Sequence, residues 1–137
     1  MILKMLEELI EEMEKSIESD DFELVMEDCM QKVEMEDIGA EAITPLLKFM
    51  ERHPLADFGM PGAIVHYVER FYKNGYEELL MESIKRRPAM HTVWMLNRII
   101  NGSEEAEKYI DLMREVINRP DVHEDIKKSA EDFLLEP

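Results

Sequence analysis

Residues 80–88 read LMESIKRRP, and closely similar stretches stand at residues 46–54 (LLKFMERHP) and 112–120 (LMREVINRP). Each stretch repeats three apolar positions, eight, seven and four residues before its proline. In chain order they are Leu46, Leu80 and Leu112, then Leu47, Met81 and Met113, then Met50, Ile84 and Val116. Proline cannot continue a helix, and a cation suits the negative end of a helix dipole. Each stretch therefore predicts a helix that ends at a basic residue just before its proline.

The prolines Pro54, Pro88 and Pro120 are separated by 34 and 32 residues. A period in the low thirties with one repeated apolar face is typical of stacked helical hairpins. Elsewhere the apolar residues also follow helical spacing, and no stretch alternates as a strand would. The sequence thus predicts an all-α chain in which residues 1–137 form a single helical-repeat domain. We expect a short, HEAT-like α-solenoid of about seven to eight antiparallel helices.

Individual helix boundaries follow from caps and breakers. We expect a first helix at residues 2–18, and a second, capped by Asp20 or Asp21, that buries one apolar face. That face consists of Phe22, Met26, Cys29, Met30 and Val33. The third helix is expected at about residues 40–52, and the fourth from Pro61 to near Asn74-Gly75. Pro88 closes the fifth, and the sixth runs from about Ala89 to Ile100. Ser103 caps the seventh, and Asp121 with Glu124 forms a capping box for the last.

The net charge of −16 is concentrated at the two ends of the chain. Residues 1–41 carry 15 acidic and three basic residues, whereas residues 42–102 carry six acidic and eight basic ones. Direct binding to nucleic acid or to an anionic membrane is disfavoured, because attraction to phosphate drives such contacts. A basic protein partner is favoured. The candidate acidic contacts are Glu23, Glu27, Asp28, Glu34, Glu36 and Asp37. The alternative is that the acidic residues only keep the protein soluble.

Signals for catalysis are weak. His123-Glu124 begins like a zinc-protease motif, but Lys127 occupies the position where that helix would need its second histidine ligand. Cys29 lies among apolar helix positions, which predicts a buried, inert thiol. No glycine-rich phosphate loop is present. We expect a protein that is not an enzyme and that needs neither a metal nor a cofactor.

The cellular setting is predicted from further features of the sequence. One cysteine cannot form an internal disulfide, and no window is long and apolar enough to span a membrane. The chain opens without a charged segment followed by an apolar one, as a secretory signal would have. We therefore expect a cytoplasmic protein that is a monomer before it binds its partner.

The centre of the chain offers the sharper binding hypothesis. His66, Glu69, Arg70 and Lys73 share a polar stripe on the predicted fourth helix, and His91, Trp94 and Arg98 cluster on the predicted sixth. Tryptophan and arginine beside histidine are typical of interface hot spots. In a stacked array, however, a helix often buries two faces, so Trp94 is equally well placed in a core. Asn97 lies between the two faces and fits either role.

Three runs within residues 54–101 resemble a known family. They are PGAIVHYVE at residues 61–69, YEELL at residues 76–80 with Ser83-Ile84, and RPAMHTVWMLNR at residues 87–98. They resemble the small HEAT-like immunity proteins of bacterial polymorphic toxin and contact-dependent inhibition systems. The resemblance implies a compact, cytoplasmic helical protein that binds and neutralises the toxin domain encoded beside it. It implies no catalytic residues, because an immunity protein has none.

Two other functions fit the same sequence. One is a general α-helical scaffold or adaptor that docks a cellular protein. The other is an acidic mimic of nucleic acid that blocks a DNA-binding protein with spaced carboxylates. The immunity hypothesis requires a cognate toxin domain as partner, and the −16 charge favours a basic one, such as a nuclease.

Overall fold

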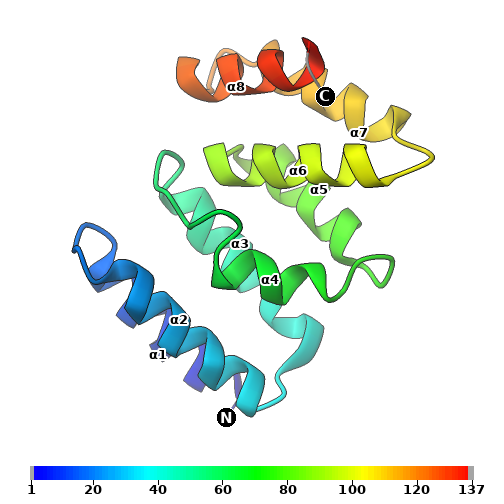
Figure 1. Ribbon diagram of the computed structural model, residues 1–137. Helices are drawn as coiled ribbons and strands as arrows, with labels where there is room; N and C mark the ends of the chain where they lie inside the picture. The colour runs from blue at the N-terminus through cyan, green and yellow to red at the C-terminus, as the bar shows by residue number, and fades with distance from the viewer. Residues whose placement is uncertain (1, 136–137) are drawn as a thin grey trace. The chain divides into compact units, whose positions relative to one another are not determined.

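The computed structural model describes residues 2–135, and within them the chain is all-helical, with no strand. The α-helices are α1 (Ile2–Ser16), α2 (Phe22–Met35), α3 (Ile43–Arg52), α4 (Ala63–Glu69), α5 (Tyr76–Arg86), α6 (Met90–Gly102), α7 (Glu107–Ile117) and α8 (Glu124–Leu135). A short 3-10 helix, η1 (Gly39–Ala42), precedes α3. Figure 1 shows these elements in chain order. The prediction of an all-α chain is confirmed.

The chain divides into two compact units. The first unit contains the chain up to Phe49 together with Phe58–Tyr76. The second unit contains Met50–Asp57 and the chain from Glu77 onward. The division falls inside α3, so the last turn of that helix belongs with α5 to α8 rather than with α1, α2 and α4.

In the first unit, α1 packs along α2, and α2 packs against α4 (Figure 1). The five apolar residues that the sequence assigned to one face of α2 are all buried. Phe22, Phe49 and Phe58 meet edge to face, with ring centroids 5.5 to 6.4 Å apart. Such contacts add to the free energy that burial of the rings supplies. The hydroxyl of Tyr67 donates to the carbonyl of Gly39 at 2.7 Å, which fastens α4 to the start of η1.

In the second unit, α6 packs against α7 and α8, which also pack on each other. The carboxylate of Glu51 at the end of α3 is buried, and two side chains of α5 satisfy it. Ser83 donates to Glu51 Oε2 at 2.7 Å, and Arg86 donates to the same oxygen at 2.8 Å. The N–H of Met90 donates to the carbonyl of Pro54 at 2.8 Å, so the loop after α3 also contacts the start of α6.

Each of the three helices α3, α5 and α7 ends within three residues of its proline, as the sequence predicts, although α7 ends at Ile117 rather than at a basic residue. Helices α3 and α5 end at Arg52 and Arg86, each two residues before its proline. Helix α7 ends at Ile117, three residues before its proline. Of the nine repeated apolar positions, eight are buried and Met81 is half-buried. The repeated apolar face is thus the buried face of each of these helices.

The fourth helix differs from the prediction at both ends. It begins at Ala63, after a cis Met60-Pro61 bond, because Gly62 has a φ of 87° that does not fit a helix. It ends at Glu69 rather than near Asn74-Gly75. Turns follow, in which Lys73 takes a left-handed φ of 65°. Lys73 therefore lies outside the helix and does not extend the polar stripe of His66 and Glu69.

Three predicted caps are also corrected. Asp21 precedes α2 but makes no side-chain cap, and its own N–H donates to the hydroxyl of Ser19. Ser103 does not cap α7, which begins at Glu107; its hydroxyl accepts from the N–H of Glu105 in a local turn. Asp121 binds Arg119 instead of closing a capping box, and His123 Nδ1 accepts the N–H of Asp125 at the start of α8. For Ser103 and Asp121, a neighbouring polar partner takes the side-chain group that the cap would use.

Candidate functional site

The first unit contains a groove that gathers several of the predicted contact residues. It has a volume of about 430 Å³ and lies beside α2, with the loop before α4 as its second wall. It is lined by Glu23, Glu27, Met30, Gln31, Glu34, Gly59, Met60, Pro61, Gly62, Ala63 and His66. We call it the acidic groove, because three of its side chains are glutamates.

Helical spacing places the α2 wall. Glu23, Glu27, Met30, Gln31 and Glu34 follow the pattern i, i+4, i+7, i+8, i+11, so they form one stripe along the helix. The adjacent stripe of α2 is buried against the rest of the unit. Met30 belongs to both stripes and supplies buried apolar surface at the edge of the groove.

The loop wall depends on a tight backbone turn at residues 58–62. Gly59 and Gly62 both have positive φ, of 98° and 87°. A Cβ atom on Gly62 would overlap the carbonyl oxygen of Phe58, so the turn has no room for a side chain there. The turn presents Met60 with 85% of its surface exposed. An exposed thioether is adaptable apolar surface at the rim of a charged groove.

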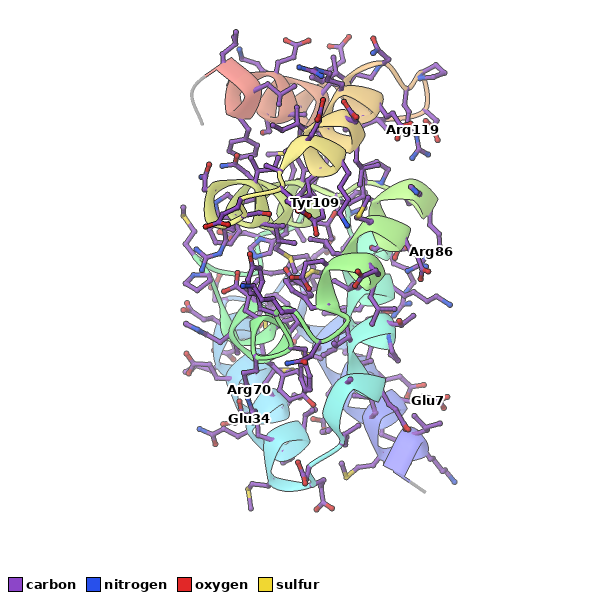
Figure 2. All side chains as sticks on the ribbon, turned by 90° about the vertical axis from the view of Figure 1, so that its right-hand side faces the viewer. Glu7, Glu34, Arg70, Arg86, Tyr109 and Arg119 are labelled. Atoms are coloured by element: carbon purple, nitrogen blue, oxygen red, sulfur yellow. The ribbon has the colours of Figure 1, made fainter. Side chains whose placement is uncertain are left out.

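The charged side chains that line the groove are mostly acidic. Glu23 and Glu27 are exposed, and neither carboxylate forms an ion pair or a hydrogen bond within residues 2–135. Glu34 Oε1 lies 3.6 Å from Arg70 Nη1, but both side chains are about half exposed, so the pair is weak. Figure 2 shows Arg70 and Glu34 close together. Three carboxylates beside methionine surface suit a lysine or arginine side chain, whose stem packs on apolar atoms while its head meets the acids.

Other candidate residues lie outside this groove. Asp28, Glu36 and Asp37 are exposed but do not line it. Asp37 follows α2 with a left-handed φ of 51°. Glu69 is half-buried at the last position of α4, and Arg70 follows it over the ring of Tyr67, 5.6 Å from the centroid. Of the predicted central residues in this unit, His66 alone lines the groove.

The α6 candidates form a stack of side chains in the second unit. The rings of His91 and Trp94 have centroids 5.1 Å apart, and the guanidinium carbon of Arg98 lies 5.1 Å from the Trp94 ring centre. His91 is buried, Trp94 is half-buried and Arg98 is exposed. The exposed part of the stack is therefore the Arg98 guanidinium over one face of Trp94. Asn97 is half-buried, and its Oδ1 accepts no hydrogen bond from the described residues.

The thiol of Cys29 is buried, as the sequence predicts. Burial, followed by its hydrogen bond to Glu12 at 3.4 Å, raises the pKa of Cys29 to about 11. A thiol with this pKa is almost entirely protonated at neutral pH and is a poor nucleophile. Among residues 2–135, no group of three or more His, Cys, Asp or Glu side chains is arranged to hold a metal ion.

Part of the acidic groove was not predicted from the sequence. The sequence pattern predicts separate surfaces for the six acidic residues and His66, and it does not indicate that residues 59–62 form a wall of a site. Pro61-Gly62 fits a helix start, but a glycine after a proline is also a turn signal. That signal would have predicted a turn before α4, but not its position beside α2.

No protein-family model, curated protein or solved structure matches this chain. None of the helices in residues 2–135 combines the length and the apolar character needed to cross a membrane.

Proposed function

We propose that this protein neutralises a basic toxin domain by binding and occluding it, in the manner of the HEAT-like immunity proteins that residues 54–101 resemble. The observation that supports the proposal best is the acidic groove, because Glu23 and Glu27 stand there without a basic partner in the described chain. A lysine or arginine of the toxin would supply the missing cation. The protein would act in the cytoplasm, as a monomer until it meets the toxin.

We further propose that the helices form a short α-solenoid. This proposal is supported by the hydrogen bonds that connect α3 to α5, and α5 to a residue after α7, because they join residues far apart in the sequence. Arg86 of α5 binds Glu51 of α3, and Arg119 after α7 donates to the carbonyls of Ile84 and Lys85 at the end of α5. These contacts join residues 34 or 35 positions apart, which is close to the sequence repeat of 34 or 32 residues. Contacts between each repeat and the next are what define a solenoid.

The functional proposal is tested by co-expression in bacteria. The gene encoded next to this one in its source genome is expressed alone and together with this protein. We expect the neighbouring product to arrest growth alone, and the wild-type protein to restore growth. A neighbouring gene that causes no arrest, or an arrest that this protein does not relieve, would favour the adaptor function instead.

A matched pair of variants tests the groove. Glu27→Lys and Asp28→Lys make the same charge change at adjacent, exposed positions of α2, but only Glu27 lines the groove. We expect Glu27→Lys to weaken toxin binding by about 2–4 kcal/mol, because it places a cation against the toxin's cation. Asp28→Lys should cost less than about 1 kcal/mol. Equal losses in the two variants would assign the acids to long-range attraction alone.

A further inference from the structure

A second groove lies in the second unit, along α5 and α7. It has a volume of about 560 Å³ and is lined by Ile84, Lys85, Leu112, Arg114, Glu115, Val116, Asn118 and Arg119. Ile84, Leu112 and Val116 are buried beneath it, and the other five side chains form its polar rim. The rim carries three cations and one acid, in a chain whose net charge is −16. We call it the basic groove.

The sequence repeat shows what is unusual about this groove. We call the contact between equivalent helices of two successive repeats a joint. The joint between α3 and α5 is formed by three polar residues. Glu51 stands three positions before Pro54, and Ser83 and Arg86 stand five and two positions before Pro88. Both α5 side chains bind the Glu51 carboxylate, and Glu51 is only 8% exposed. The α3–α5 joint is therefore sealed by a buried ionic contact.

The corresponding positions at the α5–α7 joint are Lys85, Glu115 and Asn118. A base, Lys85, takes the place of the acid Glu51. An acid, Glu115, takes the place of Ser83, and a neutral amide, Asn118, takes the place of Arg86. Within residues 2–135, no hydrogen bond or ion pair connects Lys85 to Glu115 or Asn118. The joint is bridged instead by Arg119, which donates to the carbonyls of Ile84 and Lys85 and is held in place by Asp121 at 2.8 Å. Arg86 and Arg119 are labelled on the same side of the unit in Figure 2.

We propose that the basic groove binds an acidic segment of a partner protein. A carboxylate of the segment would meet Lys85 and Arg114, and a neighbouring apolar side chain would pack on the exposed aliphatic stems of these two residues. Arg114 is available for this role because its contact with Asp111, at 3.3 Å, is between two side chains that are each more than half exposed. The proposal goes beyond the toxin-binding function, since it concerns a partner segment of opposite charge in the other unit.

The test uses a dye-labelled octapeptide of alternating leucine and glutamate, and a matched peptide of alternating leucine and glutamine. Fluorescence anisotropy measures the binding of each to the full chain. We expect the glutamate peptide to bind at least about tenfold more tightly than the glutamine peptide, despite the overall negative charge of the protein. Lys85→Glu should weaken the glutamate peptide by about tenfold or more. Lys128→Glu, the same change at an exposed position of α8 that does not line the groove, should alter binding by less than about twofold.

A second variant copies the polar residues of the α3–α5 joint into the α5–α7 joint. The triple substitution Lys85→Glu, Glu115→Ser and Asn118→Arg places the residues of the α3–α5 joint at the equivalent positions. We expect its binding of the glutamate peptide to disappear and its thermal midpoint to rise by no more than about 3 °C, because all three positions are exposed and an exposed ion pair adds little stability. Equal binding of the two peptides, equal losses for Lys85→Glu and Lys128→Glu, or unchanged peptide binding by a folded triple variant would each overturn the proposal. Binding of inorganic phosphate with none of the peptide would also overturn it, by showing a site for small anions.

Discussion

Arg86 binds the carboxylate of Glu51 through two nitrogens: Nε donates to Oε1 at 3.1 Å, and Nη2 donates to Oε2 at 2.8 Å. This hydrogen bonding raises the pKa of Arg86, whose charge is therefore permanent. Because the Glu51 side chain is only 10% exposed, Arg86 and the hydroxyl of Ser83 replace the hydrogen bonds that water would make to its carboxylate. The pair connects the end of α3 to the end of α5, one repeat later in the chain.

Arg86→Ala should lower the free energy of unfolding by about 2–3 kcal/mol, because it leaves a buried carboxylate without its cation. The cost falls below that of a fully buried pair, since Arg86 itself is about one-third exposed. Arg87→Ala, one residue along and exposed, is the matched control and should change stability by less than about 0.5 kcal/mol. Chemical denaturation measures both. Equal effects would mean that the pair adds no stability.

Gly62→Ala should destabilise the first unit by about 2–4 kcal/mol. The new Cβ would overlap the Phe58 carbonyl, and the residue would also hold a positive φ. Gly39→Ala is the control, because Gly39 has a similar φ of 81° but nothing within 4 Å of an added Cβ. It should cost only about 1 kcal/mol, from backbone strain alone. Thermal melts that rank Gly39→Ala as the more damaging change would contradict this account of the turn.

Some of these features could be predicted from the sequence and others could not, for definite physical reasons. The helix stops at residues 52, 86 and 117 depend on local chemistry, a cation and a proline, which the sequence displays directly. The start of α4 depends on a close approach between Phe58 and Gly62, and local propensity does not reveal it. The caps failed for a similar reason: Asp121 had a competing partner in Arg119.

The candidate site was predicted only in its residue types. The acids of α2 and His66 were named, but their common groove depends on how α2 packs against α4, which one sequence does not specify. The basic groove was not predicted, although the repeat alignment contains its signal. Glu51 and Lys85 are equivalent positions with opposite charge, and a reversal at a repeated joint indicates that the two joints differ.

The Trp94 and Arg98 stack predicts separate effects on stability. Trp94 is half-buried and contacts His91, so Trp94→Ala should lower the free energy of unfolding by about 2–3 kcal/mol, less than a fully buried tryptophan would. Arg98→Ala should cost no more than about 1 kcal/mol, the range of an exposed cation–π contact. Thermal melts of both variants measure this. A loss above about 4 kcal/mol for Trp94→Ala would place the ring fully in the core.

Cys29 predicts a loss of stability at high pH. Its pKa is raised from 9.0 to about 11 in the folded chain, so the unfolded thiol loses its proton first as the pH rises. The associated stability is present below pH 9 and is lost between about pH 9 and pH 11. The rate of reaction with iodoacetamide, measured against pH in the native protein, should show a midpoint near 11. A midpoint at or below 9 would contradict the buried, hydrogen-bonded thiol.

Salt separates the two roles that the acidic residues can have toward a basic partner. Raising the ionic strength from about 0.01 M to about 0.15 M shortens the Debye length from about 30 Å to about 8 Å, which weakens long-range attraction but not close contacts. If the acids of residues 1–41 steer the partner, the association rate should fall by about tenfold, while the dissociation rate changes by less than about twofold.

The α2 variants turn this salt dependence into a test of the groove itself. Glu27→Lys and Asp28→Lys remove the same charge, so both should lower the association rate by a similar factor at low salt. Only Glu27→Lys should also speed dissociation, because only Glu27 lines the groove where a bound cation would lie. Stopped-flow mixing measures the association rate, and surface plasmon resonance measures the dissociation rate. An association rate that stays constant with salt would mean that the −16 charge serves only solubility. Identical dissociation rates in the two variants would mean that the groove is not part of the binding site.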